Sequence, residues 1–372
     1  MFHSINQPGK FVGIDLFCGC GGVTRGFLDA GIKVALGIDW EPAFKKTYEQ
    51  NNRVDYLSCD IRTLSAREIL SRISFGGDKS LIISSCSPCQ PFSLKNSKRT
   101  DDGGVDYRAD LGFELVRLIK EMRAIGVSPA ALFLENVPEF AKSPTWEEIR
   151  RDLFKLGFSV AQKIINCAEY GVPQNRRRFI AVALGSWSYI SLPPATHGPG
   201  LLPFATVRNA FTDLPKIIAG QECEITPNHR ARELSEINLA RIKSVPADGG
   251  SRTSFPAELV LDCHRGFHGH QDVYGRMRFD GPAPTITTRC ISISNGRYGH
   301  PIEDRAISLR EAARLQTFPD NFIFDSPSLE TDARMVGNAV PVMVAKAIGS
   351  HLVSEVIKTF SRKPTSRLFA ES

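Results

Sequence analysis

The sequence has no long uninterrupted run of apolar residues, and this absence excludes most membrane proteins. No stretch approaches about 18 consecutive apolar residues, the length that a membrane-spanning helix requires. The N-terminal segment MFHSINQPGK also lacks the apolar core of a secretory signal peptide. Internal repeats and low-complexity tracts are absent as well. We therefore expect a cytoplasmic, globular protein that is monomeric and does not bind a membrane.

A disulfide framework is also missing. The nine cysteines are an odd number and are not grouped as in a small secreted domain, so we expect reduced thiols. The 372 residues are enough for two domains, and 42% hydrophobic with 23% charged residues is typical of a soluble protein. The net charge of +6 permits a polyanionic partner without requiring one.

The first half of the sequence alternates short β-branched runs with amphipathic segments, which is typical of a doubly wound α/β sheet. The predicted strands cover residues 11–17, 32–39, 56–60, a run from 81 that ends before Cys89, 130–136, 160–166 and 179–184. The predicted helices cover residues 23–30, 42–50, 65–73, 110–125 and 145–156. A polar loop is predicted at 95–108.

The pattern changes after residue 185, where helical periodicity fades and Pro, Gly, His and Arg become frequent. Residues 186–307 are therefore predicted to form a second, smaller and irregular domain. Periodicity returns at 308–317 and in a long stretch at 340–360, so the first domain (1–185) is predicted to be completed by 308–360. Residues 361–372 are predicted to be a flexible tail.

Two side chains with possible chemistry follow predicted strands. Cys89 stands in a Pro-Cys-Gln-Pro turn, at the edge where open α/β sheets carry their active sites, and a thiolate there can act as a nucleophile. Glu135 ends another apolar strand and should lie at the same edge, where a carboxyl group with a raised pKa can donate a proton. A buried structural cysteine and a salt-bridged glutamate are the alternatives.

A glycine-rich turn, GCGGVTRG at 19–26, follows the first predicted strand, and Asp39 ends the second. This arrangement brings the backbone close to a nucleotide and offers a carboxylate to ribose hydroxyls. Thr24 stands where a dinucleotide site would have its third glycine, which favours S-adenosylmethionine over NAD. Trp40 could stack on adenine, and Asp60 could accept from its amino group. A turn that only packs a helix on a strand is the alternative.

Three arginines at 176–178, in QNRRR, come directly before an apolar strand. Because alternate residues of a strand share a face, Arg176 and Arg178 are predicted to point the same way, toward a phosphate or a base carbonyl. A solvated charge run is the alternative.

Six sequence blocks together resemble those of bacterial DNA cytosine-5 methyltransferases of the restriction-modification type. The blocks are DLFCGCGG (15–22), SPCQPFS (87–93), ENVPEF (135–140), QNRRR (174–178), LREAARLQTFPD (309–320) and GNAVPV (337–342). They occur in the family's order between about residues 11 and 355. One departure is that Ser84, Ser85 and Cys86 stand where the family often has a small residue or glycine.

The resemblance implies a Rossmann-like methyltransferase sheet that binds S-adenosylmethionine. The residues implied to hold this cofactor are Phe17, Gly19 and Gly21 at the turn, Asp39 at the ribose, Trp40 and Asp60 at the adenine, and Asn338 over the methionine part.

The resemblance also implies the chemistry. Cys89 would add to C6 of a flipped-out cytosine, while Glu135 binds N3 and the exocyclic amine. Arg178 would hold O2, and Arg176 would support the same edge of the base. We expect the protein to protect host DNA from a companion restriction endonuclease.

The irregular segment 186–307 corresponds to the family's target-recognition domain, and the expected partner is double-stranded DNA. Thr285, in PAPTITTR (282–289), is implied to lie at the backbone of the flipped nucleotide. The other residues implied to contact DNA follow the nucleophile and are Gln90, Ser93, Lys95, Lys98, Arg99 and Arg108.

Other readings remain open at this point. A tRNA cytosine-5 methyltransferase would share these blocks, a non-catalytic DNA-binding protein could keep the fold, and an NAD-dependent oxidoreductase is disfavoured by the glycine spacing. The Cys86-Ser87-Pro88-Cys89 spacing is also found in redox and zinc sites, but no second pair follows. Cys263, His264, His268 and His270 are loosely spaced, so we predict a histidine-rich loop facing DNA and no metal site.

Overall fold

The computed structural model describes residues 9–88, 109–265, 269 and 272–360. Cys89, the predicted loop at 95–108 and the predicted tail at 361–372 lie outside the described residues.

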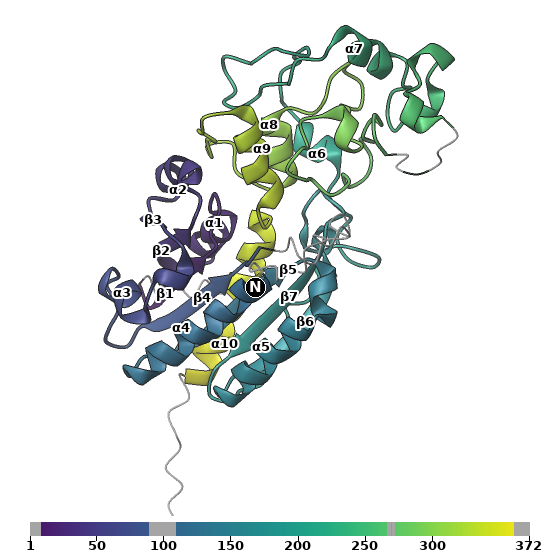
Figure 1. Cartoon of the computed structure of the whole chain (residues 1–372). Coiled ribbons are helices and arrows are strands. Elements are labelled where there is room, and N and C mark those ends of the chain that lie inside the picture. The colour runs from purple at the N-terminus through teal and green to yellow at the C-terminus, as the bar shows by residue number, and fades with distance from the viewer. Residues whose placement is uncertain (1–8, 89–108, 266–268, 270–271, 361–372) are drawn as a thin grey trace, which may run out of the picture.

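Seven strands form one mixed sheet with the order β3-β2-β1-β4-β5-β7-β6 (Figure 1). The first five strands are parallel, and β7 runs antiparallel to both β5 and β6. The strands are β1 (Phe11–Leu16), β2 (Lys33–Asp39), β3 (Tyr56–Ser58), β4 (Ser80–Ser85), β5 (Ala131–Asn136), β6 (Ser159–Asn166) and β7 (Arg177–Leu184). The predicted α/β class with a Rossmann-like sheet is confirmed.

Ten α-helices and several short 3-10 helices occur in the described part of the chain. The α-helices are α1 (Gly22–Asp29), α2 (Lys45–Asn52), α3 (Ala66–Ser71), α4 (Phe113–Ala124), α5 (Pro144–Lys155), α6 (Val207–Phe211), α7 (Glu236–Lys243), α8 (Leu309–Leu315), α9 (Leu329–Asn338) and α10 (Val342–Phe360). The 3-10 helices are η1 (Pro42–Phe44), η2 (Ile61–Thr63), η5 (Ala109–Gly112), η6 (Pro138–Lys142), η7 (Cys167–Tyr170), η8 (Arg252–Ser254), η9 (Ala257–Leu259), η10 (Asp262–His264) and η11 (Ile293–Asn295).

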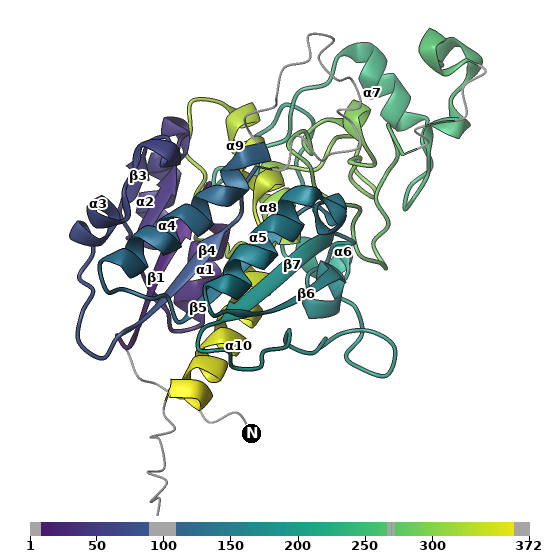
Figure 2. The ribbon, with the colours of Figure 1, turned by 60° about the horizontal axis from the view of Figure 1, so that its bottom comes forward.

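Both faces of the sheet are covered, as the apolar strands require. Figures 1 and 2 show α3, α4 and α5 on one face and α1 and α10 on the other. Alternate residues of β4 follow this division. Ile83 packs in the core cluster that contains Trp146 of α5, whereas Ile82 packs in the cluster that contains Phe27 of α1 and Ile348 of α10.

The segment 186–307 has little regular structure, and its α6 and α7 lie in the upper part of the molecule in Figure 1. Within its described residues, α6 and α7 are the only α-helices, and neither was predicted. Helix α9 was also missed, although Ser328 caps it by accepting from the Thr331 amide. The predicted division at residues 185 and 308 stays a prediction.

The stretch Leu329–Thr359 is long and apolar enough to cross a membrane, judged by length and composition alone. Half of its most apolar window is buried inside the protein, and α10 lies along α1 and the sheet. The stretch is also divided, because α9 ends at Asn338 and α10 begins at Val342. These features are typical of a core helix.

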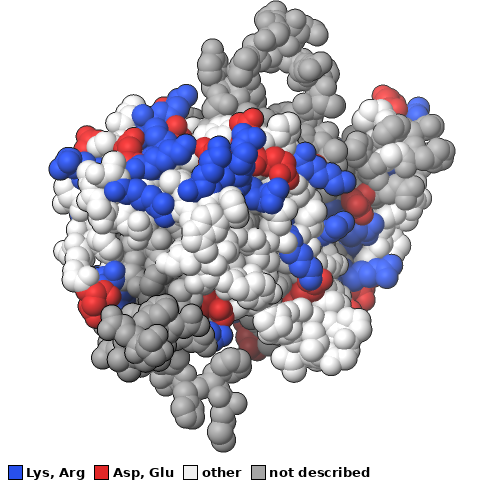
Figure 3. All heavy atoms as spheres, turned by 90° about the horizontal axis from the view of Figure 1, so that it is seen from below, with Lys and Arg blue, Asp and Glu red and all other residues white. Residues whose placement is uncertain are grey.

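Figure 3 views the molecule from below, at the end opposite to the irregular part, and shows Lys and Arg with Asp and Glu among them. On α4 and α5, Lys120 pairs with Asp152 and Arg150 pairs with Glu147, both at 2.8 Å. Exposed pairs of this kind contribute at most about 1 kcal/mol of stability. We interpret them as parts of a solvated surface of mixed charge.

Helices α1 and α10 approach most closely at Gly26, which gives a test of this packing. A Cβ atom at Gly26 would lie within 2.6 Å of the Ala345 side chain and of the Val342 carbonyl oxygen. We therefore expect Gly26→Ala to lower the free energy of unfolding in urea by roughly 2 kcal/mol or more. Gly76→Ala is the control, because nothing lies within 4 Å of its Cβ position. Equal stability of the two variants would contradict the packing.

Candidate active site

The carboxyl ends of β1, β4 and β5 meet at the upper edge of the sheet. In the parallel pairing of β4 with β5, Ser85 is opposite Leu134, so the strand that leads toward Cys89 and the strand that carries Glu135 end side by side. This agrees with the predicted placement of Glu135. The position of Cys89 itself lies outside the described residues.

Glu135 and Arg178 form an ion pair at this edge. The Arg178 Nε atom lies 3.0 Å from the Glu135 Oε1 atom, and the two side chains are only 16% and 11% exposed. The antiparallel register explains their meeting, because Glu135 is opposite Ile180, and Arg178 lies two residues away on the same face of β7. The pair presents a carboxylate and a guanidinium side by side.

Burial raises the pKa of Glu135 above its ordinary value, while the nearby Arg178 and Arg176 guanidinium groups oppose this shift. A carboxyl group in this position can therefore take up a proton and donate it. The guanidinium of Arg178 offers N–H donors only. The pair thus combines a group that can both donate and accept with a group that only donates.

Asn136, which sequence reasoning did not single out, connects this pair to the segment before Cys89. Its Nδ2 atom donates to the Ser87 carbonyl oxygen at 3.3 Å, and the Asn136 side chain is almost fully buried. A small cavity opens beside it, lined by Ser85, Ser87 and Glu135 and by apolar side chains that include Phe140 and Phe179. A signal was available, because Asn136 follows Glu135 in the ENVPEF block.

Arg176 corrects a prediction. The residue precedes β7, and it is only 2% exposed. It donates to the carbonyl oxygens of Ile286 (2.7 Å), Gly337 (3.0 Å) and Ala339 (3.2 Å). Arg176 therefore fastens backbone segments and does not present itself to a base or a phosphate.

Two buried glutamines form further hydrogen bonds between the same backbone segments. Gln174 accepts from the Ile286 amide at 2.8 Å and donates to the Gln316 Oε1 atom at 2.9 Å. Gln316 in turn donates to the carbonyl oxygens of Val336 and Ala339. Both side chains are fully buried, so losing one partner would leave buried polar groups unpaired. Sequence reasoning missed both glutamines, although they stand in two of the six blocks.

The glycine-rich turn begins where β1 ends. Phe17 has a φ of 59° and Gly19 a φ of 54°, so both are in the left-handed region that reverses the chain toward α1. Gly21, with a φ of 94°, has no room for a Cβ atom because the Tyr48 and Asn52 side chains lie against it. Such strain in a non-glycine residue like Phe17 is common at functional sites.

Asp39 lies against this turn. Its carboxylate accepts from the Gly19 amide at 2.9 Å and from the Glu41 amide at 3.1 Å. Burial raises the pKa of Asp39, while those backbone hydrogen bonds oppose the shift. A carboxylate has room for about four hydrogen bonds, so Asp39 can still accept from a ligand hydroxyl.

The remaining predicted cofactor residues surround the turn less closely. Trp40 is 71% exposed, and Asn338 is exposed at the end of α9. The Asp60 carboxylate caps η2 and pairs with Arg62, which lowers its pKa. The residues present fit a nucleoside cofactor without a pyrophosphate: a tight turn, a carboxylate with spare acceptor capacity and an exposed aromatic ring lie together. The roles of these residues stay predictions.

Among the predicted DNA contacts, Thr285 is described, and its hydroxyl donates to the Asn175 carbonyl oxygen at 2.8 Å. The other six, Gln90, Ser93, Lys95, Lys98, Arg99 and Arg108, lie outside the described residues. Within the described ranges, no group of three or more His, Cys, Asp or Glu side chains could hold a metal ion. His268 and His270 of the suspected cluster are not described. Burial raises the pKa of Cys86 well above its usual range, so this thiol is a poor nucleophile.

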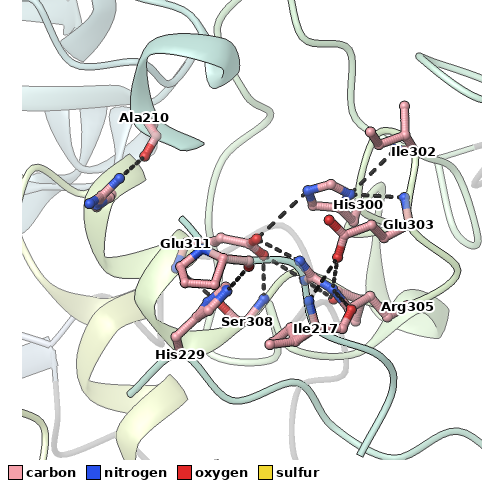
Figure 4. A network of polar contacts seen from close by, with 12 residues as sticks. Ala210, Ile217, His229, His300, Ile302, Glu303, Arg305, Ser308 and Glu311 are labelled. Carbon is pink, nitrogen blue, oxygen red and sulfur yellow. Dashed lines mark hydrogen bonds and ion pairs between the residues drawn. The ribbon is translucent and has the colours of Figure 1, made fainter. Parts of the chain in front are cut away.

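A buried polar network joins the irregular part to α8 (Figure 4). Arg305 donates to both oxygens of Glu311, at 2.8 and 2.7 Å, and both side chains are 1% exposed. Glu311 also accepts from the Ser308 amide, and the Ser308 hydroxyl lies 2.8 Å from His229 Nδ1. These contacts hold the loops that contain residues 229 and 305 against the start of α8.

His300 makes this network sensitive to acid. Its Nδ1 atom accepts from the Glu303 amide, and burial lowers the pKa of His300 to about 4. The unfolded chain therefore binds a proton that the folded protein does not between pH 6.5 and 4, so stability falls as the pH falls through this window. Glu311, whose pKa Arg305 lowers to about 2, adds a further loss below its unfolded value near 4.5.

We expect His300→Gln to reduce this acid sensitivity, because glutamine can accept the same amide without titrating. Urea unfolding at pH 7 and pH 4 should show a loss of stability that is smaller by on the order of 3 kcal/mol in the variant. His351→Gln, which removes a histidine near the surface of α10, is the control and should not reproduce the effect. An unchanged pH dependence in His300→Gln would refute the assignment.

Comparison with known proteins shows to which family the chain belongs. A family model described as C-5 cytosine-specific DNA methylase matches residues 11–354. The chain is a member of this family. The family predicted from the sequence blocks is therefore confirmed, and with it the prediction of an enzyme, a DNA (cytosine-5-)-methyltransferase.

Two relatives show how close this similarity is. The type II methylase M.HgiDII of Herpetosiphon aurantiacus is 38% identical over 348 residues, which cover 91% of this chain and 94% of the relative. The type II methyltransferase M1.HphI of Haemophilus parahaemolyticus is 32% identical, with 90% of this chain and 84% of the relative covered. The chain thus resembles methyltransferases of the type II kind over almost its whole length.

Solved structures support the fold. A putative DNA modification methyltransferase encoded within an Escherichia coli prophage has a TM-score of 0.69 at 22% identity, and the match covers 93% of this chain and 99% of that chain. The Dnmt2 methyltransferase of Schizosaccharomyces pombe has a TM-score of 0.59 at 19% identity, with 94% and 98% covered. At these identities the likeness is evidence for the methyltransferase fold alone.

Proposed function

We propose that this C-5 cytosine-specific DNA methylase transfers a methyl group from S-adenosylmethionine to C5 of a flipped-out cytosine in a specific double-stranded DNA sequence. The observation that carries the proposal is the Glu135–Arg178 pair at the edge where β4 ends. The identity to type II methylases supports a role beside a restriction endonuclease in a bacterial cytoplasm. We propose that the enzyme acts as a monomer.

The pair matches the hydrogen-bonding edge of cytosine. That edge offers the O2 and N3 acceptors and one amine donor, in this order. Arg178 can donate to O2, and a protonated Glu135 can donate to N3 while accepting from the amine. The raised pKa of Glu135 favours the protonated form that this contact needs. A uracil edge presents N3–H instead, so the same pair would discriminate against it.

The proposed reaction begins when the Cys89 thiolate adds to C6 of the base. Electron density then moves to C5, and Glu135 and Arg178 stabilise the charge that develops on the ring. S-adenosylmethionine, when bound at the glycine turn, supplies an electrophilic methyl group on its sulfonium. C5 takes that methyl, with S-adenosylhomocysteine as the leaving group. Loss of the C5 proton to a base then releases the Cys89 thiolate by elimination.

The segments that hold DNA in this proposal flank the site. A paired cytosine hides C6 in the stack, so the base must rotate out at a cost of a few kcal/mol. Residues 186–307 would read the sequence, and Thr285 would lie near the backbone of the flipped nucleotide. Gln90, Ser93, Lys95, Lys98, Arg99 and Arg108 would contact the DNA next to Cys89.

Covalent trapping tests the nucleophile. With S-adenosylmethionine and a duplex that carries 5-fluorocytosine in the recognised sequence, we expect a stable adduct at Cys89, because fluorine cannot leave as the C5 proton does. Bisulfite sequencing of plasmid DNA from expressing cells would first identify the sequence. Cys89→Ser should abolish the adduct, whereas Cys86→Ala should keep most of it. An adduct on tRNA but not on DNA would replace the proposed substrate, and loss of the adduct in Cys86→Ala alone would refute the nucleophile.

Glu135→Gln tests the base-binding pair. The glutamine amide keeps the shape and can still hydrogen-bond N3 and the amine, but it cannot transfer a proton to N3 as charge develops on the ring, so we expect methylation at saturating substrates to fall by about 100-fold or more. Binding of S-adenosylmethionine should stay the same, since Glu135 lies at the base edge and not at the glycine turn. Glu139→Gln in the following 3-10 helix is the matched control. A variant as fast as the unaltered enzyme would remove Glu135 from the chemistry.

A further inference from the structure

Asp15, a buried carboxylate in the first sequence block, has no part in the mechanism above. It lies on β1 opposite Ser84 of β4, and its side chain has no exposed surface. The Thr24 hydroxyl donates to Asp15 Oδ2, and the Ser84 hydroxyl donates to Oδ1, both at 2.7 Å. Within the described part of the chain, no Lys or Arg pairs with it. Burial raises the pKa of Asp15 to about 6 against these hydrogen bonds.

The hydrogen bonds continue beyond Asp15 as a chain of side chains, Ser84–Asp15–Thr24–Tyr48. Thr24 Oγ1 lies 2.8 Å from the Tyr48 hydroxyl, and all four side chains are fully buried. Tyr48 lies directly against Gly21 of the glycine turn, and its hydroxyl fills the space where Gly37 lacks a side chain. The chain therefore runs from β4, across β1 and α1, to the underside of the turn.

The two ends of this series of hydrogen bonds lie on the segments assigned to the nucleophile and to the methyl donor. Ser84 precedes Cys89 by five positions on the strand that leads to it, whereas Tyr48 supports the turn assigned to the methyl donor. Methyl transfer requires the donor and acceptor atoms to be about 3 to 3.5 Å apart and aligned, and a misplacement of about 1 Å can cost on the order of 100-fold in rate. Because Asp15 is buried and no Lys or Arg of the described residues pairs with it, its carboxylate depends on the Thr24 and Ser84 hydroxyl groups for hydrogen bonds.

We propose that Asp15 is a positioning residue that couples the cofactor turn to the nucleophile strand through Thr24 and Ser84. This inference rests on the proposed function. It also gives a role to the Ser84 hydroxyl, which donates to Asp15 Oδ1. Loss of either hydroxyl donor should disturb the distance between the methyl group and C5 more than the contacts that Glu135 and Arg178 make with the base.

Two rates separate these effects in the full-length protein. Attack of Cys89 on C6 makes C5 basic, so C5 can take a proton from solvent. A tritium atom at C5 is then lost to solvent as the double bond re-forms and the Cys89 thiolate leaves C6. This exchange reports the attack without methyl transfer and can be measured with S-adenosylhomocysteine. Single-turnover methylation at saturating S-adenosylmethionine and DNA reports the transfer itself.

The variants are chosen as matched sets. Ser84→Ala and Thr24→Val each remove one hydroxyl donor, and Thr24→Val does so with almost no change of shape. Thr24→Ser keeps the donor. Ser143→Ala removes another buried hydroxyl, which caps α5 and has no hydrogen bond to these four residues, so it should lower the melting temperature without affecting either rate.

We expect Ser84→Ala and Thr24→Val to slow methylation by about tenfold or more while exchange changes by less than about threefold. Thr24→Ser and Ser143→Ala should keep the ratio of the two rates. An unchanged ratio in both Ser84→Ala and Thr24→Val would overturn the coupling. If Ser84→Ala does not fold, the comparison of Thr24→Val with Thr24→Ser alone tests the coupling. Absence of both exchange and methylation in the unaltered enzyme would instead refute the proposed function.

Discussion

The pairing of β7 with β5 is the constraint on which the site depends. Because β7 enters the sheet antiparallel, it begins at the edge where the parallel strands end, and its first residues meet the last residues of β5. This direction places Arg178 diagonally across from Glu135 on one face of the sheet. A parallel β7 would bring the start of the strand to the opposite edge and separate the two groups by the length of the strand. The meeting of Glu135 and Arg178 is thus a consequence of topology.

Polar groups, and not only apolar packing, hold the irregular part in place. Arg176, Gln174 and Gln316 bond backbone carbonyls and amides from three distant segments, and the Arg305–Glu311 pair does the same above α8. Isolated buried charges are costly, but here the terminal guanidinium nitrogens of Arg176 and Arg305 and the two glutamine amides have defined acceptors, so the network favours one arrangement over others. A segment with few helices is in this way held in a fixed arrangement.

The sequence predicted the succession of strands and helices along the first half of the chain well, because β-branched runs and amphipathic segments alternate clearly there. The capping role of Ser65 was also predictable, and the structure shows its reciprocal bonds with Glu68. Helix α9 was not, because its buried face includes Asp332 and a glycine that packs against the backbone of Thr287 and Thr288. Only tertiary contacts make such a segment a helix.

Arg176 and Arg178 show the same limit of sequence-based prediction at the candidate site. In QNRRR, alternation along a strand predicts that residues 176 and 178 share a role, but the strand begins at Arg177 and Arg176 bends away into the core. The difference depends on carbonyl groups of residues 286, 337 and 339, whose nearness no local pattern reveals. Local chemistry therefore predicts which residue types belong to the site, whereas long-range contacts decide which of them are buried in contacts with the backbone. Asp15 and Ser84 extend this argument, because their hydrogen bond joins neighbouring strands that are 69 residues apart in the sequence.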